Sequence, residues 1–453
     1  MHTNNAEQRQ QMLTEPIGRL LFKKSLPTVI IQLITVIYNT ADTYFVAKVG
    51  TSASAAVGVV ISLMAIIQAI GFGIGMGANS LISPALGAKR EQDANVYGST
   101  AVLMGLIMGV VISVLGLVFL HPLLRLIGAS ETVLPFAADY AKYILIAAPF
   151  MCMAFVLNNI LRAEGQALYS MIGLSTGGIL NLILDPIFIF ALHQGIAGAA
   201  LATMIGQLAG FVILSVFFLR DRSIVKLRVR FISKKASTYW RIVRTGAPTF
   251  LRQGLASLSS TLLNVQAKAF GDAAVAAISI ANKLYMLVRN VVIGIGHGFQ
   301  PIAGYCYGAK RYSRVKKVFW RATLSATVIC FAIAVVMFVF REPIMKWFRD
   351  DPDVVRIGSD MLRFLCLAVP VLGYSTFVNQ LYQSLGFAGG ATFLASCRQG
   401  LFFIPLVFLL PALFGIAGIE SVQAAADILT CLISIPFHIC FFRKHLSLPD
   451  STD

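Results

Sequence analysis

The chain has 453 residues, of which 57% are hydrophobic and only 13% are charged, and its formal net charge is +17. A soluble protein of this length needs a polar surface, and this composition has too few polar residues to form one. The composition therefore excludes a soluble domain and favours a membrane protein.

Apolar stretches recur along the whole chain, each about 20 residues long and so able to cross roughly 30 Å of hydrocarbon as a helix. They are apolar on every face, unlike the amphipathic helices of a soluble bundle. The first follows Lys23 and Lys24 and has no small-residue cleavage pattern, so we expect a retained span and not a signal peptide. The stretches predict twelve helices, centred near residues 37, 68, 109, 149, 180, 208, 258, 290, 331, 370, 401 and 428.

The basic residues gather in particular connections between these stretches. One block extends from Arg220 to Arg244 and another from Lys310 to Arg321, whereas the alternating connections are short and poor in Lys and Arg. The positive-inside rule predicts that the basic connections are cytoplasmic, and an even number of spans places both termini on that side. The charge therefore indicates topology, and we expect no nucleic-acid partner.

Segments of the first half recur in the second half at an offset of 221 residues. Pro27-Thr28 recurs as Pro248-Thr249, and Gly87-Ala88-Lys89-Arg90 recurs as Gly308-Ala309-Lys310-Arg311. An ordered set of such matches indicates a duplication. Each copy carries an even number of helices, so the copies share one orientation, with an axis along the membrane normal and a cavity between them.

The expected fold is an all-α membrane protein of two pseudo-symmetric six-helix bundles, and one chain contains both, so a monomer suffices. We expect a cytoplasmic N-terminal segment at 1–24, an N-lobe at 25–219, a basic cytoplasmic linker at 220–246, a C-lobe at 247–442 and a cytoplasmic tail at 443–453.

Two acids lie well inside apolar helices of the first half. Asp42 lies eight residues before the turn at Gly50, and Asp185 lies ten residues before the turn at Gly195, which places them roughly 12 and 15 Å below that surface. Charged residues inside spans are costly and mark functional sites by default. Further oxygen-bearing side chains fall at the same level or on the same helix faces: Asn39, Asn181 and Thr203.

Carboxylate, amide and hydroxyl oxygens at one level suit a hard cation such as Na⁺, or a carboxyl group that carries a proton. Pro186 can free the carbonyl of Leu182 as a further oxygen. The alternative is a pair of buried neutral acids that hold helices together. The duplication favours the ion site, because the counterparts of the two acids in the second half, Leu263 and a residue near Ile404, are apolar.

The second half carries basic residues in its spans instead. Lys283 and Arg289 could pair with Asp427 or face a wet cavity, and Arg252 could reach the lipid headgroups. Pro27 and Pro248 are either hinges or ordinary first-turn prolines.

Twelve spans in two parallel lobes, Gln300-Pro301 followed by Tyr307-Gly308-Ala309-Lys310, and Asn181 with Asp185-Pro186 resemble the multidrug and toxic compound extrusion (MATE) family. The resemblance covers about residues 15–445, and the Asn-x-x-x-Asp-Pro element resembles the prokaryotic branch typified by DinF and MepA proteins.

The resemblance implies export of cationic or amphipathic drugs across the cytoplasmic membrane of a prokaryote, in exchange for Na⁺ or H⁺ and without another cofactor. It implies a cation site in the N-lobe at Asp42, Asn181, Asp185 and Thr203, with Tyr38 and Asn158 nearby. Lys283, Arg289, Gln300 and Asn379 are predicted to line the substrate cavity.

Two alternative functions rank below drug export. A flippase for lipids or lipid-linked precursors would share the architecture, and Arg252, Lys283 and Arg289 would suit a phosphate headgroup. A membrane-embedded enzyme ranks third, because the sequence has no metal-binding His motif. Residues Gly173–Gly177 match the Gly-x-Ser-x-Gly pattern of a nucleophile elbow, but that motif needs a turn between a strand and a helix, and these residues lie at the start of an apolar span.

Overall fold

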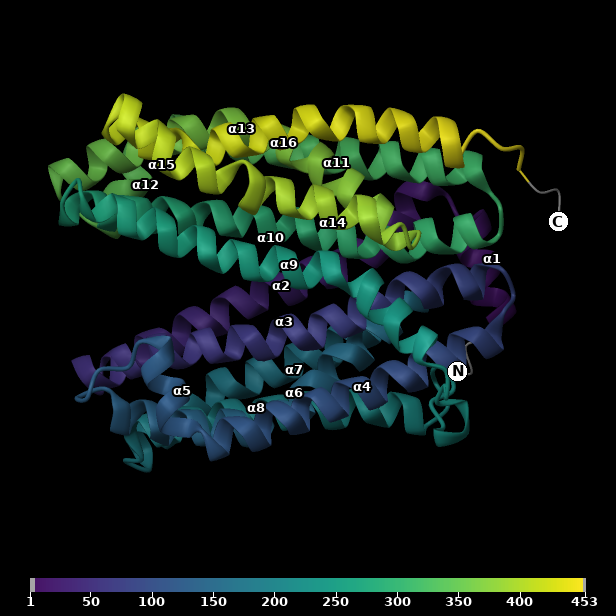
Figure 1. The fold of residues 1–453 in the computed structure, drawn as a ribbon, viewed down its shortest axis with the longest axis horizontal. Coiled ribbons are helices and arrows are strands. Elements are labelled where there is room, and N and C mark those ends of the chain that lie inside the picture. The colour runs from purple at the N-terminus through teal and green to yellow at the C-terminus, as the bar shows by residue number, and fades with distance from the viewer. Residues whose placement is uncertain (1–4, 451–453) are drawn as a thin grey trace.

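The computed structural model describes residues 5–450, and in that range every regular element is helical (Figure 1). Residues 1–4 and 451–453 of the expected terminal segments lie outside the described residues. The N-lobe contains α2 (Ile17–Ala47), α3 (Thr51–Gly87), α4 (Glu91–Val118), α5 (Leu120–Ile127), α6 (Leu134–Ala163), α7 (Ala167–Pro186), the π-turn η1 (Ile187–Ala191) and α8 (Gly195–Leu219). The C-lobe contains α9 (Ala236–Lys268), α10 (Asp272–Gly308), α11 (Tyr312–Val339), α12 (Arg341–Phe348), α13 (Pro352–Ser384), α14 (Ala388–Ser396), the π-turn η3 (Cys397–Leu401), α15 (Phe403–Phe414) and α16 (Ile416–His445).

Within residues 5–450, eleven helical segments are long and apolar enough to cross a membrane. Helix α9 has 33 residues but is more polar than the others, since it carries Arg252, Gln253, Asn264 and Gln266 along its length. With α9, these segments give the twelve long helices that the sequence predicts, in two bundles.

The two lobes lie close together at one end of the molecule and diverge toward the other (Figure 1). We call the first the basic end, because the segment 220–235 and the start of α11 lie there together with α1 (Asn5–Thr14). We call the other the far end, where the short helices α5 and α12 lie. Inter-lobe contacts join α2 to α10 and α3 to α9.

Glycines bring the helices of the two lobes into close contact on the basic-end side. A Cβ atom on Gly298 of α10 would lie 2.6 Å from the backbone N and Cα of Ser25 on α2, and one on Gly294 would lie 2.8 Å from Cα of Val29. Gly77 of α3 and Gly246 of α9 approach each other in the same way. Across the first of these contacts, Ser25 Oγ donates to the carbonyl of Ile295 (3.1 Å). We call this set of contacts the glycine seam.

Helix α1 joins both lobes at the basic end. Gln8 donates to the carbonyl of Gly165 (3.3 Å) and Arg9 to that of Gly87 (3.0 Å), both in the N-lobe. From the C-lobe, Arg314 donates to the carbonyl of Met12 (3.2 Å), near the end of α1. Helix α1 therefore ties the lobes together where they converge.

The segment between the lobes is held on the N-lobe by one buried acid. Glu164, just after α6, accepts hydrogen bonds from Ser223 Oγ (2.5 Å) and from the backbone N–H groups of Ile224 and Val225 (3.0 Å each). Burial raises the pKa of the Glu164 carboxyl to about 7, although its three hydrogen bonds oppose that shift.

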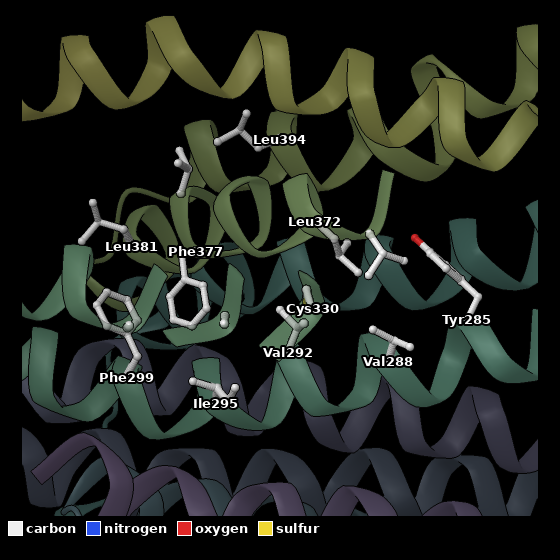
Figure 2. Packing of buried hydrophobic residues seen from close by; sticks show 14 of the residues in the cluster. Tyr285, Val288, Val292, Ile295, Phe299, Cys330, Leu372, Phe377, Leu381 and Leu394 are labelled. Carbon is white, nitrogen blue, oxygen red and sulfur yellow. The ribbon is translucent and has the colours of Figure 1, made fainter. Parts of the chain in front are cut away.

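The core of the C-lobe lies between α10, α11 and α13 (Figure 2). Phe299 of α10 packs edge-to-face on Phe377 of α13, with ring centroids 5.4 Å apart. Lipid tails are as apolar as these side chains, so dense van der Waals packing holds such helices together more than the hydrophobic effect does.

Candidate cation-coupling site

Four elements of the N-lobe bring buried oxygen-bearing side chains together. Asn181 of α7 donates from Nδ2 to Asp185 Oδ1 (3.3 Å) and to Thr203 Oγ1 of α8 (3.1 Å). Tyr140 of α6 donates its hydroxyl hydrogen to Asp42 Oδ2 of α2 (3.2 Å), and its oxygen also lies 3.4 Å from Thr203 Oγ1. A continuous hydrogen-bonded chain therefore runs from Asp42 to Asp185, and we call these five residues the acid cluster.

Tyr140 is the member that sequence reasoning missed. Its side chain is fully buried, and its hydroxyl joins the two halves of the acid cluster. A tyrosine in an apolar span has no spacing signal that distinguishes it from an ordinary core aromatic residue. Only the packing of α6 between α2 and α8 shows where its hydroxyl lies.

Three oxygen atoms of the acid cluster are buried without a hydrogen-bond partner among the described residues: Asp42 Oδ1, Asn181 Oδ1 and Asp185 Oδ2. Neither carboxyl group has an ion-pair partner in residues 5–450. A buried polar atom without a partner costs about 1–3 kcal/mol, and more if it is charged. A proton or a metal cation at these oxygens would remove that cost.

The backbone changes its winding directly after Asp185. Pro186 has no N–H to donate, and the helix continues as the π-turn η1, in which Leu192 N–H donates to the Ile187 carbonyl (2.9 Å). π-Turns inside α-helices are frequent at functional sites.

Of the other predicted N-lobe residues, Tyr38 lies near the acid cluster, whereas Asn39 and Asn158 do not join it. Tyr38 lines a cavity of about 60 Å³ with Gln32 and Gln207, next to the acid cluster on α2. Asn39 is exposed. Asn158 lies away from the acids, because it is eighteen residues beyond Tyr140 on α6, roughly 27 Å along a helix. Its Nδ2 donates to Ser170 Oγ (2.6 Å), so it joins α6 to the start of α7.

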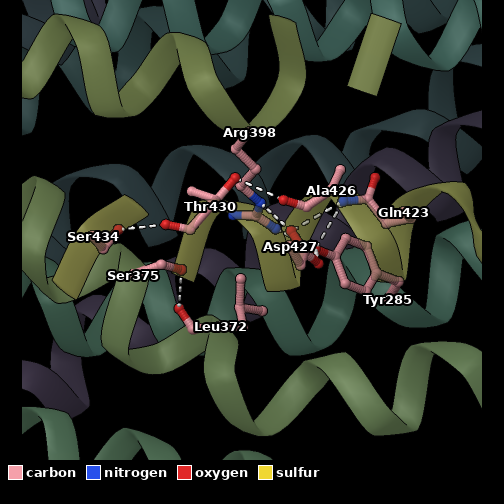
Figure 3. A network of polar contacts seen from close by, with 9 residues as sticks. All are labelled: Tyr285, Leu372, Ser375, Arg398, Gln423, Ala426, Asp427, Thr430 and Ser434. Carbon is pink, nitrogen blue, oxygen red and sulfur yellow. Dashed lines mark hydrogen bonds and ion pairs between the residues drawn. The ribbon is translucent and has the colours of Figure 1, made fainter. Parts of the chain in front are cut away.

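In the C-lobe, Asp427 does not pair with Lys283 or Arg289, which is one of the two arrangements that the sequence leaves open for these basic residues. Asp427 pairs with Arg398 of η3 at 2.7 Å (Nε to Oδ1) and also accepts the hydroxyl hydrogen of Tyr285 (Figure 3). The π-turn η3 places Arg398 beside Asp427 of α16. Arg398 is a basic residue in an apolar span, so the same criterion that identifies Arg252, Lys283 and Arg289 also identifies it.

The predicted substrate-cavity residues lie in two environments. Lys283 and Arg289 line a cavity of about 210 Å³ in the C-lobe. Asn379 donates to the Ala391 carbonyl (2.7 Å), next to that region. Gln300 is buried, and neither polar atom of its amide has a hydrogen-bond partner in the described part of the chain.

Both candidate hinge prolines lie inside helices. Pro27 is ten residues beyond the start of α2 at Ile17, and Pro248 is twelve beyond the start of α9 at Ala236. The alternative of a first-turn proline is therefore wrong for both. Each removes an interior backbone hydrogen bond, which makes bending easier there.

Comparison with known proteins identifies the family. The family model MatE matches residues 27–187 and 248–409, so one match lies in each lobe. The two matches begin at Pro27 and Pro248, the recurring prolines that indicate the duplication. The multidrug export protein MepA of Staphylococcus aureus strain MSSA476 is 27% identical over 446 residues, 98% of each chain. MepA of Staphylococcus haemolyticus strain JCSC1435 is 28% identical over 433 residues, 95% of each chain.

A solved structure, described as the outward-facing conformation of a multidrug resistance MATE family transporter of the MOP superfamily, superimposes with a TM-score of 0.90. It is 24% identical in sequence, and the match covers 95% of this chain and 97% of that one, so it supports the fold. The two family matches, the twelve helices in two bundles and this superposition lead to one conclusion: the chain belongs to the MATE family of multi-pass membrane transporters and is not an enzyme.

Proposed function

We propose that the protein exports cationic or amphipathic organic compounds from the cytoplasm of a bacterium and takes up Na⁺ or H⁺ in exchange. Its relatives are named multidrug export proteins, which supports the substrate class. The acid cluster supports the coupling, since three of its buried oxygens lack a partner among the described residues.

Transport proceeds by alternating access. The positive-inside rule predicts that the basic end is cytoplasmic, so the far end, where the two lobes diverge, faces outside. The coupling ion enters from the far end and binds at Asp42, Asn181, Asp185 and Thr203. Bending of α2 near Pro27 then links ion binding to closure of the far end and opening of the basic end.

The residues of the acid cluster fit either ion. Hard cations prefer carboxylate, amide and hydroxyl oxygens, which are the groups present here. A proton would need only one of the two carboxyl groups. No cofactor is required, and one chain contains both lobes.

The test is transport in proteoliposomes with separately imposed Na⁺ and pH gradients. We expect wild-type protein to move a fluorescent cationic substrate under one of the two gradients, and Asp42→Asn and Asp185→Asn to lose that dependence. Glu131→Gln is the matched control, because Glu131 is an exposed acid that pairs with Arg125. Normal ion-dependent transport by both acid-cluster variants would refute the proposal.

A flippase for lipids or lipid-linked precursors is the second candidate, and the basic residues Arg252 and Arg289 in the C-lobe favour it. The same proteoliposomes distinguish the two functions. Movement of a labelled phospholipid between leaflets, without movement of the cationic substrate, would assign the protein to this class.

A further inference from the structure

The C-lobe interior carries more basic than acidic side chains among the described residues, and only one of its three arginines forms an ion pair. Arg252 of α9, Arg289 of α10 and Arg398 of η3 line one cavity of about 30 Å³. Arg289 also forms the wall of the adjoining cavity of about 210 Å³, whose rim carries Lys283. Among the described residues, no acid lines either cavity. Asp427, which contacts Tyr285 and Gln423 in the wall of the larger cavity, pairs with Arg398.

Arg252 and Arg289 therefore have no ion-pair partner in the part of the chain that the structure describes. The Nε atom of each is buried and has no hydrogen-bond partner there. Asp427 is not available to them, because Arg398, Tyr285 and Gln423 already occupy its carboxylate oxygens (Figure 3). A guanidinium group remains protonated in proteins and is costly to bury without an anion.

The surrounding side chains suit an anionic group with an organic body. The wall between the two cavities carries Gln399, and Asn379 and Thr430 line the smaller one, so neutral hydrogen-bonding groups lie around the two arginines. The larger cavity is also lined by Met286 and Phe403, which offer apolar contact. A planar guanidinium matches the two oxygens of a carboxylate or phosphate.

We infer that Arg252 and Arg289 form an oxyanion subsite in the C-lobe, which binds the carboxylate or phosphate group of an amphipathic substrate. The inference rests on the proposed export function and extends its substrates from cations to zwitterions and anionic amphiphiles. The two lobes then differ in purpose: the acid cluster of the N-lobe binds the coupling cation, and the C-lobe binds the acidic part of the substrate.

The test compares two dyes that differ only in the acidic group: a rhodamine with a free carboxylate and its methyl ester. Binding to purified protein in phosphatidylcholine nanodiscs is measured by fluorescence anisotropy. We expect tighter binding of the free acid by wild-type protein, and a loss of roughly tenfold or more for that dye in Arg252→Gln and Arg289→Gln, as for one charge-assisted hydrogen bond. The ester should bind these variants as it binds wild type.

Arg349→Gln is the matched control, since it removes the same charge from an exposed position at the end of α12. Arg289→Lys keeps the charge but loses the planar fork, and should recover part of the affinity for the free acid. Equal losses for both dyes would indicate general damage to the cavity, and no loss for either would show that the arginines bind no substrate anion. Either result overturns the inference.

Competition with short-chain phosphatidylglycerol identifies the source of the anion. If it displaces the free-acid dye from wild type and phosphatidylcholine does not, the subsite takes a lipid phosphate; if neither lipid does, it takes the acidic group of a drug. Binding by purified protein does not depend on transport. If cells with the wild-type protein do not export the ester, that result counts against the proposed function. If the purified wild-type protein binds the free acid no more tightly than the ester, that result counts against the subsite.

Discussion

Replacing Gly298 by alanine should open the basic end of the transporter. The added Cβ would lie 2.6 Å from N and Cα of Ser25, whereas ordinary contacts of this kind are 3.4–4 Å. An ordinary contact therefore requires helices α2 and α10 to separate by about 0.8 Å at this point of the glycine seam. Both atoms belong to the backbone of Ser25, so no side-chain rotation can relieve the contact.

The energetic effect follows from overpacking and from lost hydrogen bonds. Overpacking of a close contact costs typically about 1–3 kcal/mol. The seam bonds from Ser25 Oγ to Ile295 O (3.1 Å) and from Thr28 Oγ1 to Gly294 O (2.6 Å) would lengthen as well, each worth about 1 kcal/mol. Since these costs fall only on the state with the seam closed, the population with a separated basic end should rise roughly tenfold for each 1.4 kcal/mol.

A native cysteine can report this change. Cys306 lies eight residues beyond Gly298 on α10, is fully buried, and its Sγ is 3.9 Å from the Met12 carbonyl of α1. Separation of the lobes exposes it, so its labelling by a maleimide, followed by peptide mass spectrometry, should be roughly tenfold faster or more in Gly298→Ala. Gly254→Ala is the control, because Gly254 also lies in a helix and has nothing within 4 Å of the added Cβ.

The reasoning is refuted if Gly298→Ala and Gly254→Ala are labelled at the same rate while both remain monodisperse. Gly294→Ala gives an independent check, since its Cβ would lie 2.8 Å from Cα of Val29. Cys306→Ser should abolish the signal and so verify which thiol reacts.

Two further predictions concern single side chains. Tyr140→Phe removes the hydroxyl that links Asp42 to Thr203 and should weaken the apparent affinity for the coupling ion about fivefold, which corresponds to about 1 kcal/mol. The control Tyr44→Phe changes an exposed tyrosine and should leave the affinity unchanged. Equal affinities for the two variants would contradict the role of Tyr140. For Glu164, burial raises the pKa of the docked carboxyl from an ordinary 4.5 to about 7, so the protonated form favours docking of residues 220–235. That stabilisation is complete below about pH 4.5 and is lost as the pH rises to about 7. The measurement is the rate of tryptic cleavage after Lys226 in wild type relative to the rate in Glu164→Gln. This ratio should rise between pH 5 and pH 7.5, and a constant ratio would contradict the prediction.

Much of the fold could be predicted from local sequence. Apolar length, the recurrence of Pro27 and Pro248 and the basic connections were enough to predict twelve helices in two related lobes, because each depends on short-range patterning and on the length of a span. The level of Asp42 and Asp185 also followed, since helix rise converts residue number into depth. This level predicts Asp42, Asp185 and Thr203 of the acid cluster, and the i, i+4 spacing to Asp185 predicts Asn181.

What depends on helix rotation and inter-helix packing could not be predicted. Tyr140 joins the acid cluster and Asn158 does not, although both lie on α6, because the side-chain neighbours of a buried helix are set by its partners. Arg398 forms an ion pair with Asp427 because the π-turn η3 positions its side chain beside α16. Arg252 and Arg289 therefore have no ion-pair partner among the described residues. The sequence by itself determined the number of long helices and the position of each charge along its helix. Only the tertiary structure decided which charges meet, since that depends on side-chain contacts between helices distant in the chain.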